Sequence, residues 1–482
     1  MADYDYDIGV LGGGAAGLTV ASGAAQLGAR TLLIEKEAEL GGDCLHFGCV
    51  PSKTLIKSAH VRNLMKNAES YGLPEVELPE VDFRQIADRI RSVVGKIQKH
   101  DSVARFNNLG VEVLFGDPVF SDEHTVTLGS KRISAKSWVV ATGSSAAVPP
   151  LEGLNEVPCL TNREIFYLDS LPKSLIVLGA GPIAAEMAQA FCRLGSKVTV
   201  LQRSSQILSK EDKDMADQVQ AAMESEGVVF HLGCKIIRAK DCGDHRQVTI
   251  EDSAGHKVVV EGTEILVALG RQANVDGLGL ESIDLNYSGR GISVDNRLRT
   301  NHKHIYAAGD VIGGYQFTHA AGYEGGIVVS NAIFHLPRKV NYNWMPWCTY
   351  TGPELASIGL NEKAARAKNI DYTVSVEKFA DNDRGLAEGA EEGMVKLILS
   401  KKGKPLGVQI LGLHAGDILG EWVAVLNGGV KLSALAGAIH PYPTLVEINK
   451  RVVGNIYAKK IFSAKVKKVL KLLFSYRGPI NP

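Results

Sequence analysis

Two glycine-rich segments with the same internal spacing constrain the fold of this chain most strongly. Residues 6–36 read YDIGVLGGGAAGLTVASGAAQLGARTLLIEK, and residues 174–203 read SLIVLGAGPIAAEMAQAFCRLGSKVTVLQR. Each runs from an apolar strand through a tight glycine turn into a helix and then a second strand, which is the pattern of a dinucleotide-binding unit. The sequence therefore predicts an α/β protein with two Rossmann-like domains.

The first copy contains the full GxGxxG fingerprint, at Gly12, Gly14 and Gly17. The first glycine permits the tight turn, the second lets the backbone approach a pyrophosphate, and the third lets the helix pack on the strand. The N-terminus of that helix favours the phosphate charge. Glu35 closes the second strand 23 positions after Gly12 and can accept hydrogen bonds from a ribose.

The second copy keeps two glycines, Gly179 and Gly181, and has alanine in the third place. Gln202 stands 23 positions after Gly179, where the first copy has its acid, and Arg203 follows directly. An acid would repel a ribose 2′-phosphate, whereas an arginine can bind one. The sequence therefore favours NADP over NAD. The alternative interpretation, that Arg203 is a solvated surface residue, stays open.

The bulk composition excludes several classes of protein. The chain has 482 residues, which predicts two to four domains, and its 53 basic and 53 acidic residues give a formal net charge of zero. No nucleic acid partner is therefore expected. The start MADYDYDIGV has acids where a secretory signal would be basic, and no apolar run reaches a membrane-spanning length. We expect a cytoplasmic protein, whose thiols stay reduced.

Residues 41–53 read GGDCLHFGCVPSK and place Cys44 and Cys49 five positions apart. In a reducing compartment such a pair indicates catalysis or metal binding rather than a structural disulfide. His46 lies between the cysteines, but the spacing is not the usual C-x2-C, and no second ligand pair completes a metal set nearby. A redox pair is the favoured interpretation, and no metal site is predicted.

Three further segments complete the pattern. Residues 138–150 and 265–274 each combine an apolar strand with a glycine turn, and residues 304–333 combine a strand, a loop and a helix. Together with the fingerprints and the cysteine segment, they resemble the pyridine nucleotide-disulfide oxidoreductases of the glutathione reductase, dihydrolipoamide dehydrogenase and mercuric reductase group. The mercuric reductase-like branch is the most similar, because of GGDCLHFGCVPSK and a C-terminal HPYPTLVE.

The resemblance implies the domain order, the cofactors and the partner. It predicts an FAD domain at residues 1–150 and 273–342, an NAD(P) domain at 151–272 and a C-terminal α+β interface domain at 343–482. The interface domain is expected to form a homodimer whose active site is shared between chains. The residues expected to bind FAD or NAD(P) are Gly12, Gly14, Gly17, Glu35, Lys36, Gly42, Asp43, Lys53, Gly116, Thr142, Gly143, Gly179, Gly181, Gln202, Arg203, Gly270, Gly309, Asp310, Thr318, His319 and Ala320.

The resemblance also implies roles around the cysteines. Cys49 would be the flavin-side sulfur and Cys44 the one that attacks the substrate, both near a helix N-terminus that lowers a thiol pKa. Lys53 would sit near the flavin and pair with Glu186 of the second fingerprint helix, because a buried charge needs a partner. Pro182 stands where family members often carry an aromatic residue that covers the flavin.

The C-terminal segment AIHPYPTLVEINK departs from the family at one position. The disulfide-reducing members have HPTxxE, in which the histidine protonates a leaving thiolate and the glutamate holds its ring. Here Thr444 and Glu447 match, but Tyr442 takes the place of the histidine, and His440 lies two positions earlier. A tyrosine, with an ordinary pKa of about 10 against about 6.5 for histidine, is the poorer proton shuttle at neutral pH.

These residues predict an FAD-dependent enzyme that passes electrons from NAD(P)H through the flavin to Cys44–Cys49 and on to a disulfide, with His440 assisting Tyr442. The alternative is a metal-ion or quinone reductase of the same family. Mercury reduction is less favoured, because the terminal FSYRGPINP lacks the vicinal cysteines that mercuric reductases use. A purely structural or binding role is disfavoured by the intact flavin, nucleotide and disulfide motifs.

The segment 459–477, KKIFSAKVKKVLKLLFSYR, mixes basic and apolar side chains in the pattern of an amphipathic helix. Such a helix can lie on an anionic membrane surface. The favoured interpretation is that its apolar stripe packs on its own domain or on the dimer mate, with the charges in solvent.

Overall fold

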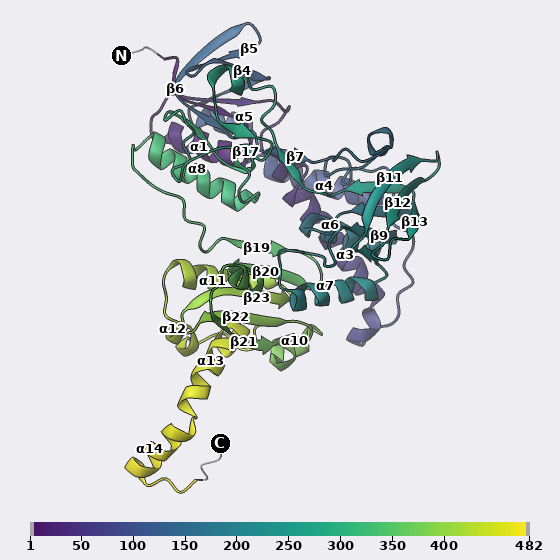
Figure 1. Cartoon of the computed structure of the whole chain (residues 1–482), viewed down its shortest axis with the longest axis vertical. Coiled ribbons are helices and arrows are strands. Elements are labelled where there is room, and N and C mark those ends of the chain that lie inside the picture. The colour runs from purple at the N-terminus through teal and green to yellow at the C-terminus, as the bar shows by residue number, and fades with distance from the viewer. Residues whose placement is uncertain (1–3, 479–482) are drawn as a thin grey trace. The chain divides into compact units, whose positions relative to one another are not determined.

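A computed structural model describes residues 4–478 and divides the chain into two compact units (Figure 1). The first unit comprises the chain up to Asn67 together with Glu75–Arg203 and Val228–Asn341. The second comprises Ala68–Pro74, Ser204–Gly227 and the chain from Tyr342 onward. The expected NAD(P) domain at 151–272 stays a prediction. Ser204–Gly227 lies within this range but belongs to the second unit.

The first sheet of the first unit is the predicted dinucleotide-binding sheet. Its strands are β3 (Val111–Phe115), β2 (Thr31–Glu35), β1 (Tyr6–Leu11), β6 (Lys131–Val140), β5 (Thr125–Leu128) and β4 (Pro118–Asp122), in that order, with β18 (Ile305–Ala307) paired to β6. Strands β1, β2, β3, β6 and β18 pair in parallel. Strand β2 is buried along its whole length, and β6 is buried over its last three residues, which include the fully enclosed Trp138.

Helices α1 (Ala15–Gln26) and α8 (Thr318–Ala332) pack closely against each other beside this sheet (Figure 1). Two glycines allow the approach. A Cβ on Gly325 would lie 2.9 Å from the Ala16 carbonyl oxygen, and one on Gly23 would lie 3.0 Å from Val329. The close packing places the N-terminus of α8 at the same end of the sheet as the first glycine turn.

The second dinucleotide sheet is fully parallel. Its order is β10 (Val229–Leu232), β9 (Lys197–Gln202), β8 (Ser174–Leu178) and β14 (Glu264–Val267), and α6 (Pro182–Leu194) follows β8. A separate antiparallel sheet is formed by β11 (Lys235–Asp241), β12 (Arg246–Glu251) and β13 (Lys257–Gly262). The prediction of two Rossmann-like folds is therefore confirmed.

Helix α3 (Cys49–Lys66) links the two dinucleotide folds within the first unit. It packs against α6 and against α4 (Phe83–Gln98). The rings of Phe83 and Phe191, both buried, stack with centroids 5.6 Å apart and join α4 to α6. This packing holds the cysteine-bearing helix beside the helix of the second fingerprint.

The second unit is built on a five-stranded antiparallel sheet. The order is β19 (Pro346–Thr349), β20 (Glu354–Gly359), β23 (Pro405–Gly412), β22 (Met394–Ser400) and β21 (Tyr372–Lys378). Helices α11 (Ala415–Asn427) and α13 (Glu447–Ile461) pack on the sheet and enclose Trp422. Helix α7 (Lys213–Ser225) also belongs to this unit. The predicted α+β character of the C-terminal domain is confirmed.

The remaining helices and strands are short. They are α2 (Gly42–His46), α5 (Val103–Asn108), α9 (Glu362–Ala367), α10 (Asp383–Ala387), α12 (Leu432–Gly437), α14 (Ala464–Phe474), β7 (Ser144–Ala146), β15 (Arg271–Ala273), β16 (Tyr287–Ser288) and β17 (Gly291–Ile292), besides five single-turn 3-10 segments. Across residues 4–478, none of the helices combines the length and the apolarity that crossing a bilayer would require.

The predicted amphipathic helix near the C-terminus is present as α14, and Ser463 caps its start by accepting a hydrogen bond from the backbone of Val466. None of its residues is buried. Figure 1 shows α14 beyond the end of α13, away from the sheet of its own unit. Packing of the apolar stripe on its own domain is therefore not found among the described residues, and the expected packing on the dimer mate stays a prediction.

Candidate redox site and dinucleotide cradles

The two cysteines lie at the junction of two helices. Cys44 is in α2, and Cys49 is the first residue of α3. Gly48 allows the tight connection, because a Cβ there would lie 2.9 Å from the Asp43 carbonyl oxygen. Both thiols are free, with Cys44 half-buried and Cys49 exposed. The arrangement brings the two sulfurs together at the N-terminus of the longer helix.

The electrostatic surroundings make the two thiols unequal. The hydrogen bond from Cys44 is the largest influence on Cys49. Together with the Thr318 hydroxyl, 3.4 Å away, and the charge of Lys53, it lowers the pKa of Cys49 to about 6. The same hydrogen bond, together with burial, raises the pKa of Cys44 well above its ordinary range. The uncapped N-terminus of α3 also favours a thiolate at its first residue. At neutral pH the reduced pair therefore carries its negative charge on Cys49.

Lys53 and Glu186 form the ion pair expected from the sequence. The Lys53 Nζ atom lies 2.7 Å from a Glu186 carboxylate oxygen, and the glutamate side chain is only 4% exposed. Lys53 is one helical turn beyond Cys49 in α3, and Glu186 is in α6. The packing of these two helices thus sets a paired positive charge beside the thiolate.

The first glycine turn is shaped to receive a dinucleotide. A Cβ on Gly12 would lie 2.4 Å from the Ala141 carbonyl oxygen, and one on Gly17 would lie 1.9 Å from the Gly12 oxygen. Gly14 is the N-cap residue of α1, which has no side-chain cap, so the first amides of this helix can receive a phosphate. Glu35 is held by the backbone amides of Gly13 at 2.5 Å and Glu37 at 2.8 Å. These residues fit the FAD pyrophosphate and ribose that the family resemblance implies.

A cluster of four side chains beside this turn was only half predicted. Asp43 and Asp310 were expected, whereas Arg271 and Ser144 were missed. The Arg271 guanidinium binds Asp43 at 2.9 Å and donates to the Ser144 hydroxyl at 2.7 Å. That hydroxyl donates to Asp310 at 2.6 Å, and burial raises the pKa of this carboxyl. The antiparallel pairing of β7 with β15, which sequence spacing does not reveal, brings the cluster together.

The N-terminus of α8 reaches the cysteines directly. Thr318 is its first residue and contacts Cys49, and the helix has no side-chain cap. His319 stacks on the ring of Phe317 with centroids 5.2 Å apart, and Ala320 is fully buried. The chain enters this helix after Gly309, whose amide donates to the Glu324 carboxylate at 2.7 Å. Glu324, a buried anchor of the loop, was not predicted.

Four other predicted cofactor residues have clear positions. The Thr142 hydroxyl donates to the Asn274 carbonyl oxygen at 2.7 Å, and the Gly143 carbonyl accepts from the backbone amide of Asn274 at 3.0 Å. A Cβ on Gly42 would lie 2.7 Å from the Gly14 Cα, so these two backbones approach closely. Lys36 instead has an exposed side chain 3.7 Å from Asp117.

Two predicted glycines lie at strand ends. The Gly116 amide, just after β3, donates to the Glu35 carbonyl oxygen at 2.9 Å. Gly270 directly precedes β15 and has a φ of +128°, a backbone conformation that favours glycine.

The second glycine turn has the same construction. Gly179 has a φ of +104°, and a Cβ there would lie 2.5 Å from the Ala268 carbonyl oxygen. Gly181 is the N-cap residue of α6, which has no side-chain cap. A Cβ on Gly181 would meet no atom of residues 4–478 within 4 Å, so the space above the helix N-terminus is open. Gln202 ends β9 and is half-buried, while Arg203 after it is exposed. An exposed arginine at this strand end is accessible to a nucleotide.

The predicted acid–base residues lie in the second unit and form two separate pairs. The Tyr442 hydroxyl donates to Asp383 at 2.8 Å, and this hydrogen bond raises the pKa of Tyr442. His440 is nearly buried and lies 2.8 Å from Glu421 through its Nε2 atom. Its Nδ1 atom is buried and has no hydrogen-bond partner among residues 4–478. Glu447 is the first residue of α13. Sequence reasoning missed both Asp383 and Glu421, which lie 59 and 19 positions from their partners.

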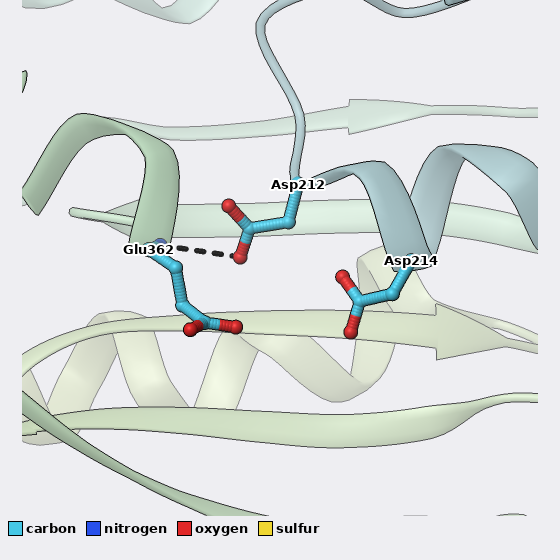
Figure 2. Close-up of side chains that lie close together, drawn as sticks. All are labelled: Asp212, Asp214 and Glu362. Atoms are coloured by element: carbon cyan, nitrogen blue, oxygen red, sulfur yellow. Dashed lines mark hydrogen bonds between the residues drawn. The ribbon is translucent and has the colours of Figure 1, made fainter. Parts of the chain in front are cut away.

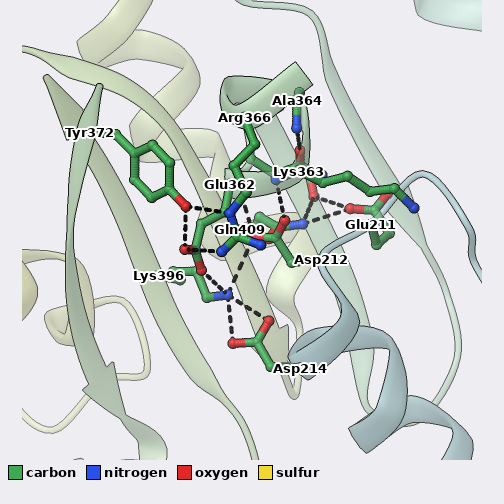
Figure 3. A network of polar contacts seen from close by, with 12 residues as sticks. Glu211, Asp212, Asp214, Glu362, Lys363, Ala364, Arg366, Tyr372, Lys396 and Gln409 are labelled. Atoms are coloured by element: carbon green, nitrogen blue, oxygen red, sulfur yellow. Dashed lines mark hydrogen bonds and ion pairs between the residues drawn. The ribbon is translucent and has the colours of Figure 1, made fainter. Parts of the chain in front are cut away.

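Three carboxylates in the second unit could at first be taken for a metal site. Asp212, Asp214 and Glu362 bring ligand oxygens within 4.8 Å of one another (Figure 2). The ammonium of Lys396 already lies among them, at 3.3, 2.6 and 3.0 Å (Figure 3). With that position filled by a lysine that is 2% exposed, the cluster is a buried ion network.

Comparison with protein families gives two consecutive matches. Residues 6–325 match the model of the pyridine nucleotide-disulphide oxidoreductases, and residues 345–452 match the dimerisation domain of the same family. The two matches together account for most of the chain and follow the order expected from the sequence.

Individual relatives agree with this result. The chain is 33% identical to a mercuric reductase of Bacillus cereus over 92% of its own length and 70% of that protein. It is also 33% identical to a dihydrolipoyl dehydrogenase of Bacillus subtilis, over 91% and 96%. Among solved structures, the Cu(II) complex of the HOCl-induced flavoprotein disulfide reductase RclA from Escherichia coli has a TM-score of 0.83 at 27% identity. That likeness covers 95% of this chain and 100% of the other.

The paired thiols of Cys44 and Cys49 at a helix N-terminus, the two glycine cradles and the family matches lead to one conclusion. Flavin and pyridine nucleotide are the cofactors of this family, and Cys44–Cys49 is its redox pair. The chain belongs to the pyridine nucleotide-disulphide oxidoreductase family and is a flavoprotein disulfide reductase with its own dimerisation domain.

Proposed function

We propose that this enzyme oxidises NADPH and passes the electrons to Cys44–Cys49, which then reduces a disulfide substrate. The observation that carries the proposal is the placement of Cys44 and Cys49 at the start of α3, with the Lys53–Glu186 ion pair one helical turn further along. Bound FAD would supply two-electron transfer between nicotinamide and disulfide. The chain holds it through the turn at Gly12, the Glu35 carboxylate and the start of α8.

On the substrate side, the thiols of Cys44 and Cys49 pass two electrons to the substrate disulfide in two steps. Cys44 gives up its proton, and its sulfur attacks one sulfur of the substrate disulfide. This attack forms a mixed disulfide and releases one substrate thiolate, which takes up a proton. Cys49 then attacks the Cys44 sulfur, which re-forms the Cys44–Cys49 disulfide and releases the second thiolate. Two electrons leave the pair for each disulfide reduced, and one group must accept the Cys44 proton and return it to the leaving sulfur.

Tyr442, with His440 nearby in sequence, is the proposed source of that proton. The loop that carries it stands out from its unit, since Ile439 is 98% exposed and Tyr442 71% exposed. Such an apolar projection on a dimerisation domain suits insertion into a second subunit. In the proposed homodimer, Tyr442 of the partner subunit completes the site at Cys44, while Asp383 and the His440–Glu421 pair hold the loop.

Changing Tyr442 to phenylalanine is expected to lower kcat for disulfide reduction by about 10²-fold, because general acid–base catalysis is typically worth that much. Changing it to histidine is expected to restore or exceed the original rate and to move its pH optimum toward neutrality. Steady-state rates across pH measure both effects. Asp383→Ala is the matched control, because it removes the acceptor of this hydrogen bond but keeps the Tyr442 hydroxyl. Equal rates for the phenylalanine variant and the original enzyme would remove Tyr442 from the mechanism.

The preference for NADP is proposed from Arg203. Its exposed guanidinium follows β9, where the first fold has Glu35, and a charge-assisted hydrogen bond to a 2′-phosphate contributes about 1.5–3 kcal/mol. Arg203→Ala is therefore expected to raise KM for NADPH by about 10- to 100-fold and to leave KM for NADH nearly unchanged. An equal change for the two nucleotides would show that Arg203 is only a surface residue.

A metal-ion or quinone reductase is the second candidate, because the chain resembles mercuric reductases as closely as dihydrolipoyl dehydrogenases. NADPH oxidation with lipoamide, glutathione disulfide, Hg(II) and a quinone as alternative acceptors separates the two. The proposal expects a disulfide to give the highest kcat/KM. Fast turnover with Hg(II) or the quinone, and slow turnover with every disulfide, would favour the second candidate.

A further inference from the structure

The segment 459–477, which contains α14, concentrates positive charge. Residues 459–477 contain seven basic residues and no acidic one. Since the formal net charge of the whole chain is zero, the other 463 residues carry a net charge of −7. The rest of the chain is net negative and is repelled by anionic surfaces. Any attraction of the protein to such a surface must therefore come from residues 459–477.

The helix also separates charge from apolar surface. Val466, Val469, Leu470 and Leu473 follow the i, i+3, i+4, i+7 spacing and share one face. The lysines lie around the remainder of the circumference, at Lys465, Lys467, Lys468 and Lys471. The apolar face is open to solvent, because Val469, Leu473 and Phe474 are 45%, 66% and 59% exposed.

We propose that α14 docks the enzyme on an anionic lipid surface, with its apolar face at the boundary between headgroups and acyl chains and its lysines at the lipid phosphates. This inference goes beyond disulfide reduction and does not depend on the substrate. Lysine-rich helices with leucine and phenylalanine on the other face have the composition of interfacial membrane helices.

A second copy of the chain fits this helix less well than lipid. Protein interfaces are depleted in lysine, and helices that pair with each other usually carry charges of both signs. Residues 459–477 carry only one sign. Lys465 and Lys467 border the apolar stripe, where long side chains can reach outward to phosphate while their stems remain in the apolar layer.

Cosedimentation of the full-length holoenzyme with vesicles tests the proposal. The enzyme is expected to sediment with vesicles of phosphatidylcholine and phosphatidylglycerol at low salt and to stay in solution with phosphatidylcholine alone. Each basic residue near an anionic surface contributes about 1 kcal/mol, so each lysine lost should weaken binding by about fivefold. The charge variant replaces four lysines of the helix by glutamine: Lys465, Lys467, Lys468 and Lys471.

Two further variants sharpen the result. Leu470→Gln with Leu473→Gln keeps every charge and should weaken binding by at least about tenfold per leucine. The matched control makes the same charge change at exposed lysines of the first unit: Lys96, Lys99, Lys131 and Lys136. The control should bind vesicles like the original enzyme, and all three variants should keep its turnover, because none of these residues contacts the cysteines or the glycine cradles.

Three outcomes would overturn the proposal. The first is an original enzyme that does not sediment with the anionic vesicles. The second is a leucine variant that no longer forms the dimer of the original enzyme, when neither protein binds vesicles. That result would show that a second copy of the chain covers the apolar face. The third is tight binding of an oligonucleotide that the charge variant loses and the leucine variant keeps, which would assign the helix to nucleic acid.

Discussion

Replacing Cys49 by serine is expected to lower the rate of NADPH-driven disulfide reduction by at least about 10³-fold, and Cys44→Ser should have an effect of the same size. A hydroxyl neither forms a disulfide nor provides a thiolate at neutral pH. The two effects should not add, because the pair acts as one unit. Steady-state oxidation of NADPH with the best disulfide acceptor measures the loss.

The matched control is Cys242→Ser, which changes a thiol after β11 that is not part of the predicted site. It should retain the full rate. Each cysteine variant should still bind FAD, since the Gly12 turn and Glu35 are untouched. Full turnover of disulfides by Cys44→Ser would show that electrons reach the acceptor by another route.

Replacing Lys396 by methionine is expected to destabilise the second unit by about 3–5 kcal/mol, which is the usual effect of removing one partner from a buried ion network. The change leaves Asp212, Asp214 and Glu362 facing one another without their ammonium. Burial alone would raise the pKa of Glu362, but the hydrogen bonds from Lys396 and Tyr372 and the charges of Lys396 and Arg366 together outweigh it and hold that pKa below its usual range. Methionine has a similar volume, so packing is largely preserved.

The pH dependence of this variant follows from the same charges. Without Lys396 the pKa of Glu362 rises, so this carboxyl takes up a proton in the folded state as the pH falls toward about 4, which relieves the repulsion. The destabilisation should therefore be largest near neutral pH and should shrink in acid. Hydrogen exchange of peptides across β22 and β23 measures it locally. Lys401→Met, which removes an exposed pair with Asp371, should change stability by no more than about 1 kcal/mol.

The network around Lys396 was beyond the reach of the sequence. Lys396 lies in a strand of apolar residues, and its partner Asp214 is 182 positions earlier. The spacing of residues in the sequence does not show that Ser204–Gly227 belongs to the same unit as the C-terminal sheet and not to the second dinucleotide fold. Arg271 and Ser144 were missed for the same reason, since the pairing of β7 with β15 joins residues 127 positions apart.

The parts that could be predicted are those in which local sequence fixes local geometry. The Gly12 and Gly179 turns need glycine because a Cβ would strike a carbonyl oxygen, so the requirement is written in the chain itself. The Lys53–Glu186 pair could be predicted because each residue sits at a fixed distance from a recognised motif. The α14 helix was also predicted from its periodicity, but what its apolar face contacts depends on surfaces that a helical pattern does not specify.

The central claim is that electrons from NADPH pass through the Cys44–Cys49 disulfide. The direct measurement is alkylation and peptide mass spectrometry of the air-oxidised holoenzyme, before and after anaerobic addition of NADPH. The account predicts that Cys44 and Cys49 are both protected before the addition and both alkylated after it, while the labelling of Cys242 does not change. Cysteines that stay in the same state while NADPH is consumed and an acceptor is reduced would contradict it.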